Sequence, residues 1–161
     1  MSAPIPAPYR VFLLYVEPAS TLLGAFFAHC RQHQYLALTH ARSAPANDSP
    51  VPVGTAVALS QLANLYVLFA LNEVLVLRST RDRRVWRALV WGLLLADLGH
   101  LYGLVPLGLD VFWKFWAWNA MDWGNVGFVY WGAATRMCFL YGIGLGHAGD
   151  RSRDDAVTKF Q

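Results

Sequence analysis

Charged residues are scarce in this sequence. They make up 14% of its 161 residues, whereas a soluble globular domain has about a quarter. Hydrophobic residues make up 56%, and 7 Trp, 7 Tyr and 9 Phe are too many aromatic side chains for a chain that stays solvated. The composition therefore excludes both an ordinary soluble globule and an intrinsically disordered chain.

Cysteine is also rare, with only Cys30 and Cys138. In the topology derived below, their depths differ by roughly 20 Å at ~1.5 Å per residue, and a disulfide needs α-carbons within about 7 Å. We expect both thiols to be free. The sequence lacks a P-loop, a dinucleotide-binding glycine motif, a nucleophile elbow and a CxxC motif, so we expect neither phosphoryl nor hydride transfer by familiar motifs.

The hydrophobic residues form four runs, each long enough to cross ~30 Å of hydrocarbon as a helix. These runs cover residues 9–30, 55–77, 85–105 and 125–145. A cleaved signal peptide is the alternative for the first run, but Glu17 and Pro18 interrupt it and no cleavage site follows. We predict an all-α fold, an integral membrane four-helix bundle over residues 1–148 with a disordered polar tail over 149–161. The proline-containing segment 31–54 is expected to be an extended, non-cytosolic loop.

The basic residues indicate how these spans are oriented. One side of the four-span arrangement holds nine of them: Arg10, Arg78, Arg81, Arg83, Arg84, Arg87, Arg151, Arg153 and Lys159. The other side holds Arg31, Arg42 and Lys114. The positive-inside rule then places both termini in the cytosol, in a membrane that we expect to be the endoplasmic reticulum. No nucleic-acid motif accompanies the basic residues, so we expect membrane lipids, not nucleic acid, as their partners. No oligomeric state follows from the sequence.

Ionisable residues within the spans need a partner or a task, because a charge at the middle of a span costs at least ~2.5 to 3.5 kcal/mol. Glu17, Arg136 and Asp97 lie at about 12, 14 and 18 Å from the cytosolic end at ~1.5 Å per residue. Three such groups at one depth on different helices predict a single polar chamber at the axis of the bundle. A purely structural ion pair between Asp97 and Arg136 is the alternative.

Two neighbours add to this chamber. His100 follows Asp97 by one helical turn and can act as an acid or a base near neutral pH, although a histidine that only bonds a neighbouring span is equally compatible with the sequence. Pro18 follows Glu17 and leaves the Leu14 carbonyl without its helical donor, so we expect the helix to bend there. No third metal ligand has suitable spacing, so we expect neither a metal nor a cofactor.

Amide side chains follow one face of the second run. Gln61, Asn64 and Asn72 lie within roughly 80° of one another at 100° per residue, so we expect this stripe to face the bundle, either as interhelical hydrogen-bonding groups or, for Asn64, as part of a ligand pocket. Glu73 points away from this stripe and lies closer than the amides to the cytosolic end of the helix. We expect it to pair near the surface with Arg78, Arg81 or Arg87.

A combination of short motifs resembles a fungal family of short multi-pass membrane proteins known only as a domain of unknown function. The matching motifs, spread over about residues 9–146, are Tyr15-Val-Glu17-Pro18, Gly24-Ala25, Asn72-Glu73, Leu77-Arg78-Ser-Thr-Arg-Asp82 with Trp86, Asp97-Leu-Gly-His100-Leu-Tyr102, Trp118-Asn119, Asp122-Trp123-Gly124-Asn125, Arg136 and Phe139-Leu140-Tyr-Gly142. The size and the embedded carboxylates look, more distantly, like the emopamil-binding or EXPERA group and the small membrane terpene cyclases. That likeness implies proton-driven chemistry on a lipophilic substrate.

Two functions follow as hypotheses. The first is an enzyme of fungal secondary metabolism that isomerises or cyclises a terpenoid or polyketide-derived metabolite. Glu17 is then the acid, and Asp97 is the base, oriented by Arg136 and assisted by His100. The candidates for substrate binding are the polar Asn64 and the aromatic Tyr102, Tyr130 and Trp131. Aromatic faces stabilise a developing cation. The second is a non-catalytic protein that binds a sterol or lipid or scaffolds a complex, with the same polar groups joining helices.

Overall fold

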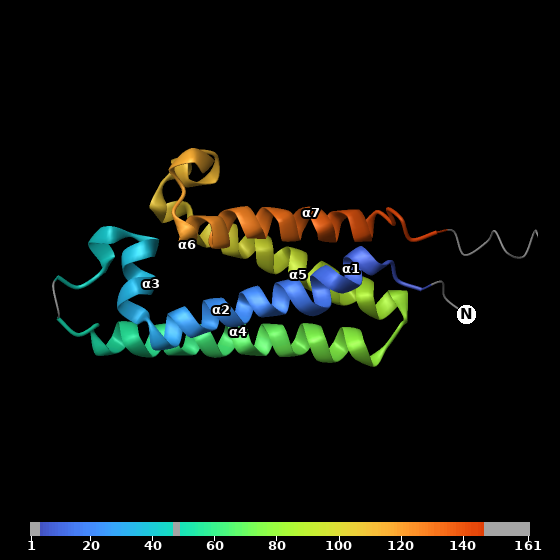
Figure 1. Ribbon diagram of the computed structural model, residues 1–161, viewed down its shortest axis with the longest axis horizontal. Coiled ribbons are helices and arrows are strands. Elements are labelled where there is room, and N and C mark those ends of the chain that lie inside the picture. Colours follow the sequence, from blue (N-terminus) through green and yellow to red (C-terminus); the bar gives the residue numbers. More distant parts are fainter. Residues whose placement is uncertain (1–3, 47–48, 147–161) are drawn as a thin grey trace, which may run out of the picture.

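The computed structural model describes residues 4–46 and 49–146, and all regular structure in these residues is helical. Long helical stretches run side by side as an elongated bundle (Figure 1). They are α1 (Ala7–Val11), the π-helix η1 (Phe12–Val16) and α2 (Glu17–Cys30) in direct succession; α4 (Val53–Ser79); α5 (Arg83–Gly103); and α6 (Ala120–Asp122), the π-helix η6 (Trp123–Phe128) and α7 (Val129–Leu140) in direct succession. The prediction of an all-α fold is confirmed.

Three of these stretches, within the described residues, are long and apolar enough to cross a membrane. They cover Ala7–Cys30, Val53–Ser79 and Arg83–Leu107. The last stretch, residues 120–140, is not among them, since it contains polar residues such as Asn125 and Arg136. A fourth span and cytosolic termini therefore stay predictions. The two ends of the described chain do lie at the same end of the bundle (Figure 1), where the Tyr9 hydroxyl donates a hydrogen bond to the Ile143 carbonyl over 2.8 Å.

The connection between the first two stretches contains a helix that the prediction of an extended loop missed. α3 (Gln32–Thr39) turns across the end of the bundle and is followed by the short 3₁₀ turn η2 (Ala41–Ser43) (Figure 1). The prolines that indicated a loop all come after α3, and a proline does not prevent helix formation in the residues well before it. α3 contacts α2 and α6, so it closes one end of the bundle.

The connection between α5 and α6 consists of short 3₁₀ turns that project from the bundle near α6 (Figure 1). These turns are η3 (Val105–Leu107), η4 (Leu109–Phe112) and η5 (Phe115–Ala117). The Trp118 indole donates to the Val111 carbonyl over 2.8 Å, which fixes the fold of this segment. Asn119 then caps α6 through the backbone N–H groups of Met121 and Asp122.

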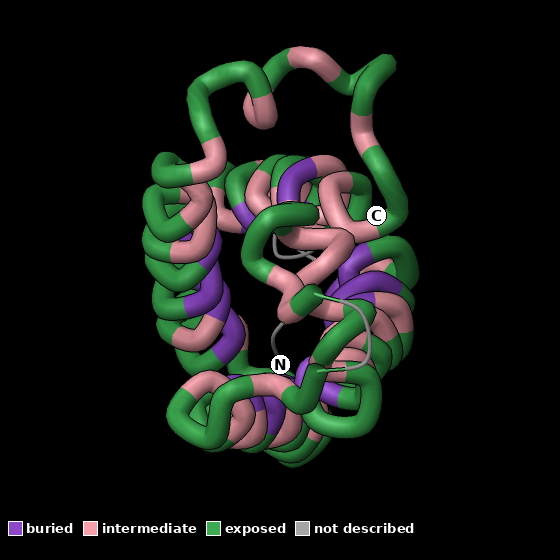
Figure 2. The backbone as a smooth tube through the Cα atoms, turned by 90° about the vertical axis from the view of Figure 1, so that its left-hand side faces the viewer, coloured by how far each residue is buried: buried purple, intermediate pink, exposed green. Residues whose placement is uncertain are grey.

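The buried residues lie on the inward faces of the helices (Figure 2). One apolar cluster, around Phe12, Trp86 and Phe139, fills the end of the bundle that holds the chain ends. A second cluster consists of small residues, Ala25, Ala28 and Ala63, which let α2 and α4 pack closely. Both cysteines are free in the structure, as predicted.

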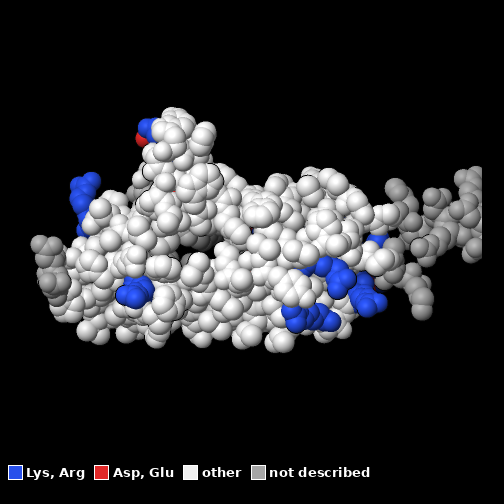
Figure 3. Space-filling view, in the orientation of Figure 1, with Lys and Arg blue, Asp and Glu red and all other residues white. Residues whose placement is uncertain are grey.

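Basic side chains gather at the end of the bundle where α4 and α5 meet (Figure 3). This end carries the arginines of the connecting turn, and the Arg83 guanidinium donates to the Leu145 carbonyl there. That this end faces anionic lipid headgroups stays a prediction.

Candidate functional site

A buried arginine connects three helices near the middle of the bundle. Arg136 of α7 is 1% exposed. Its guanidinium donates to Asp97 Oδ2 of α5 over 2.8 Å and to Glu17 Oε1 of α2. The structure thus brings together the three ionisable residues that the sequence places at one depth. The arrangement goes beyond the expected Asp97 and Arg136 pair, because the single guanidinium serves two carboxylates.

The position of this guanidinium depends on a glycine one turn earlier in the same helix. A Cβ atom added at Gly132 would collide with Arg136 Nη1, so any larger residue would displace the guanidinium from its partners. Gly132 also lines the cavity described below. It therefore provides the space in which the arginine side chain turns towards α2 and α5.

Glu17 enters the cluster directly after a π-helical segment. The Glu17 N–H donates to the Phe12 carbonyl, five residues back instead of four, and the next residue, Pro18, has no N–H to donate. The helix thus accommodates the proline with the wider hydrogen-bonding pattern of η1. π-helical turns inside α-helices are frequent at functional sites. The Glu17 carbonyl also accepts a hydrogen bond from the Thr21 hydroxyl over 2.9 Å.

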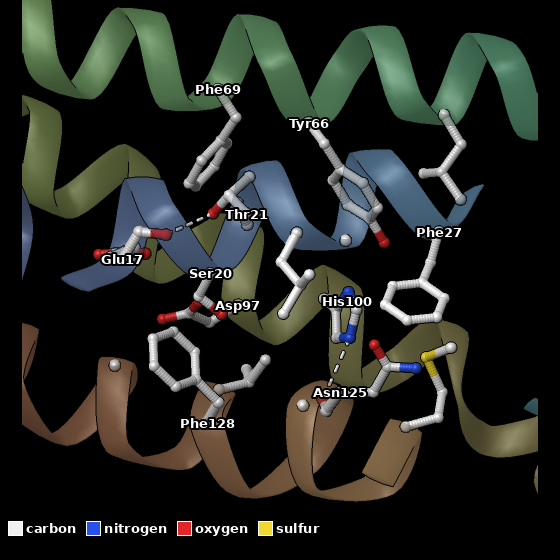
Figure 4. A pocket seen from close by; sticks show the side chains of 18 of the residues that line it. Glu17, Ser20, Thr21, Phe27, Tyr66, Phe69, Asp97, His100, Asn125 and Phe128 are labelled. Atoms are coloured by element: carbon white, nitrogen blue, oxygen red, sulfur yellow. Dashed lines mark hydrogen bonds between the residues drawn. The ribbon is translucent and has the colours of Figure 1, made fainter. Parts of the chain in front are cut away.

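A cavity of about 600 Å³ extends from this cluster along the inside of the bundle. Glu17, Asp97 and Arg136 lie at one end of it, and α3 covers the other (Figures 1 and 4). Aromatic side chains from several helices line the space between, namely Phe27, Tyr35, Tyr66, Phe69 and Phe128. The cavity is therefore charged at one end and aromatic along its length, which suits a lipophilic ligand with one reactive or polar end.

His100 lines the same cavity, between the charged end and the end that α3 covers (Figure 4). Its Nε2 lies 3.1 Å from the Asn125 carbonyl of η6. A carbonyl only accepts hydrogen bonds, so Nε2 carries the proton that this contact needs. The contact is the interhelical bond that the sequence left open as an alternative to pairing with Asp97. His100 and Asp97 share the cavity, and no hydrogen bond joins them in the described part of the chain.

The predicted aromatic lining is wrong. Tyr102 is 80% exposed on the surface of the bundle. The Tyr130 hydroxyl donates to the Phe112 carbonyl over 3.0 Å, which engages it with the connection before α6. Trp131 is mostly exposed and packs on Phe12. None of the three is among the residues that line the cavity.

The amide stripe also faces away from the cavity, contrary to prediction. Gln61, Asn64 and Asn72 are exposed, and Asn64 lines a separate shallow hollow on the outside of α4 together with Gln61. The face of α4 that packs inwards carries Ala63 and Ala70. Small side chains allow close helix contact, and this close packing sets the rotation of α4 and turns the amides outwards.

Glu73 is the residue that the sequence interpretation misplaced most. It is 0% exposed, so the expected surface pairing with an arginine of the α4–α5 turn is wrong. It lies on the buried side of α4, together with Ala70 and Leu77. Neither of its oxygens has a hydrogen-bond partner in the part of the chain that the structure describes.

Tyr35 of α3 lines the end of the cavity that this short helix covers. Burial raises the pKa of the Tyr35 hydroxyl above its ordinary value, and the nearby Tyr66 hydroxyl raises the pKa further. The two tyrosine hydroxyls thus lie close together at this end of the cavity. The position of Tyr35 depends on α3, which the sequence interpretation left as a loop.

Comparison with known proteins gives a family without a known activity. A search of curated proteins and a search of solved structures each find no match to this chain. A family model matches residues 2–146, which include the cluster around Arg136, the cavity and all described residues. The chain therefore belongs to the family defined by a domain of unknown function, DUF7704.

Proposed function

We propose that this protein is an integral membrane enzyme of secondary metabolism that isomerises or cyclises a lipophilic, terpenoid or polyketide-derived metabolite by moving protons inside the bundle. The observation that carries the proposal is the cavity of about 600 Å³ with Glu17, Asp97 and Arg136 at one end and aromatic faces along its walls. Acid and base groups exchange protons with the substrate, and aromatic faces stabilise a developing positive charge.

The membrane part of the proposal rests on the three apolar helices and on the shared location of the chain ends. In this arrangement the stretch over 120–140 is a fourth span, and both termini are cytosolic at the basic end of the bundle in the endoplasmic reticulum. Arg136 is tolerated in such a span because Glu17 and Asp97 neutralise it inside the bundle.

The charges of the cluster fit acid and base work. One guanidinium faces two carboxyl groups that line the cavity. If both carboxyl groups were ionised, an uncompensated negative charge would remain in a site with little water, so the cluster favours keeping a proton on a carboxyl group. We assign Glu17 as the acid that donates a proton and Asp97 as the base that removes one. His100 lies beside the path of the substrate and orients it.

The test compares variants in a host supplied with candidate terpenoid and polyketide precursors, with products measured by mass spectrometry. Glu17→Gln and Asp97→Asn keep the shape of the side chains and cannot exchange protons, so each should lower conversion at least about 100-fold. The matched control is Asp110→Asn, which removes an exposed carboxylate that pairs with Lys114 on the surface. The control should convert normally. A fully active Glu17→Gln protein that reaches the membrane would overturn the acid assignment.

A non-catalytic protein that binds a sterol or lipid is the second candidate. Arg136 favours it, because its two ion pairs join α2, α5 and α7 and would stabilise the bundle without any reaction. The two functions differ in one result. A binding protein should gain thermal stability with a lipophilic ligand that is recovered unchanged, whereas an enzyme should return a product.

A further inference from the structure

Glu73 and Glu17 face each other across the contact between α2 and α4. These helices are antiparallel (Figure 1), and a Cβ atom added at Gly24 would lie 3.5 Å from the Tyr66 ring. Two helical turns from Gly24 towards the N-terminus lead to Glu17, and two turns from Tyr66 towards the C-terminus lead to Glu73. The register of the two helices therefore places the two glutamates opposite each other.

Three of the four carboxyl oxygen atoms of this pair lack a hydrogen-bond donor among the described residues. Glu17 Oε1 accepts from Arg136, but Glu17 Oε2 and both oxygens of Glu73 have no partner among residues 4–46 and 49–146. Both side chains are buried, at 5% and 0% exposure. Two ionised carboxylates can only accept hydrogen bonds, whereas a protonated carboxyl group can donate one. A proton on either glutamate would turn an unfavourable contact between acceptors into a hydrogen bond.

We infer that Glu17 and Glu73 share a proton, so that Glu73 stores the proton that Glu17 delivers. Glu73 is not among the residues that line the cavity, which makes it a positioning residue that acts through Glu17. Its role in turnover rests on the function proposed above. During turnover the proton passes from the Glu17–Glu73 pair to the substrate, and Asp97 removes a different proton from the substrate. Exchange with water then returns the Asp97 proton to the pair, so that the proton count is unchanged.

The amino-acid composition permits a selective test, because Glu17 and Glu73 are the only glutamates in the sequence. Protein made by cell-free synthesis with glutamate labelled with ¹³C at the side-chain carboxyl group, and placed in lipid nanodiscs, should show a protonated-carboxyl infrared band at neutral pH. The band should shift with the label and again in D₂O. The wild-type spectrum alone is decisive: without such a band the inference is overturned, whatever the stability of the variants.

Variants identify the two partners. Glu73→Gln should remove the band, because Glu17 then pairs with Arg136 as a carboxylate and the proton that the cluster keeps lies on Asp97, which carries no label. Glu17→Gln should change the frequency of the band, because Glu73 then bonds to an amide. Asp97→Asn is the control and should keep the band. A band that persists in Glu73→Gln, or one that is unaffected by Glu17→Gln, would contradict proton sharing.

The infrared spectrum tests the shared proton, and the conversion assay tests the proposed enzyme function, so either claim can be contradicted without the other. The band is measured without substrate, so a protein with the band and no conversion of any precursor would retain the shared proton and lose the proposed enzyme function. Once a precursor is converted, Glu73→Gln should lower its conversion at least tenfold while the protein still reaches the membrane. Full conversion by Glu73→Gln would show that Glu17 obtains its proton elsewhere and would overturn the storage role.

Discussion

Arg136 has two carboxylate partners, so removal of the arginine and removal of one partner should lower the free energy of unfolding by different amounts. Asp97→Asn leaves the arginine paired with Glu17, whereas Arg136→Gln leaves two buried carboxylates without a counter-charge. We expect Arg136→Gln to lower the free energy of unfolding by about 3–5 kcal/mol and Asp97→Asn by about 1–3 kcal/mol. Denaturation of both variants in the same detergent checks this order. Equal losses would mean that the Glu17 contact contributes nothing to stability.

Gly132 offers a second test at the residue scale. Gly132→Ala should displace the Arg136 guanidinium and destabilise the protein by about 1–3 kcal/mol, as overpacking of a tight site does. The control is Gly92→Ala in α5, where an added Cβ meets no atom within 4 Å. This control should stabilise α5 by about 0.5–1 kcal/mol, because alanine favours a helix more than glycine does. Thermal unfolding in detergent compares them, and equal effects would exclude the predicted collision.

The sequence predicted part of the charged cluster for a clear physical reason. Depth along a helix follows from residue number, so the meeting of Glu17, Asp97 and Arg136 could be expected from the four apolar runs alone. Rotation about the helix axis does not follow from depth. Both its direction, away from the amide stripe, and its depth, closer to the cytosolic end, predict a surface position for Glu73, whereas the antiparallel register of α2 and α4 puts it opposite Glu17. That register was a signal that the sequence interpretation did not use.

At the scale of the elements, π-helical segments lie in two of the helices that form the cavity. η1 directly precedes Glu17, and η6 contains Asn125, whose carbonyl accepts the His100 hydrogen bond. The sequence predicted a disturbance at Pro18, because proline lacks an N–H, but it did not predict a π-helix. It gave no sign of η6 at all, where no proline is present. Such segments depend on tertiary packing, which local propensity does not describe.

Pro18→Ala tests what η1 contributes. Alanine restores the missing N–H, so α-helical hydrogen bonding can extend through this turn and rotate the carboxyl group of Glu17 within the cluster. We expect stability to change by no more than about 1 kcal/mol and conversion to fall by up to about tenfold, since a small misplacement of a catalytic group slows the reaction. Unfolding in detergent and product formation are measured on the same preparation. Conversion equal to that of Glu17→Gln would show that proline itself is essential.

For the whole molecule, the central question is the number of membrane crossings. Three apolar helices and one more polar stretch form the bundle, and the described chain ends lie together (Figure 1). An even number of crossings puts both termini on one side, whereas three crossings would separate them. Arg136 joins the 120–140 stretch to the other helices through Asp97 and Glu17. The same charged residue lowers the mean hydropathy of this stretch, which makes the stretch hard to identify as a span.

Topology mapping checks the four-span proposal. Epitope tags at either terminus should both be accessible after selective permeabilisation of the plasma membrane, because the four-span proposal places the basic end of the bundle in the cytosol. An acceptor site for N-glycosylation inserted in the α3–α4 connection should be modified, and the same site added after the last residue should not. Glycosylation at the C-terminus would contradict four spans and favour three.

The connection of Glu17 with Arg136 also affects the order of events during synthesis. The two residues are 119 positions apart, so the first helix enters the membrane long before its cationic partner has been made. Until then Glu17 has no arginine to neutralise it, and a lone carboxyl group in hydrocarbon is unfavourable. The nascent first helix should therefore remain associated with the insertion machinery until the last helix arrives. Truncation before Arg136 should yield a chain that is retained there and degraded.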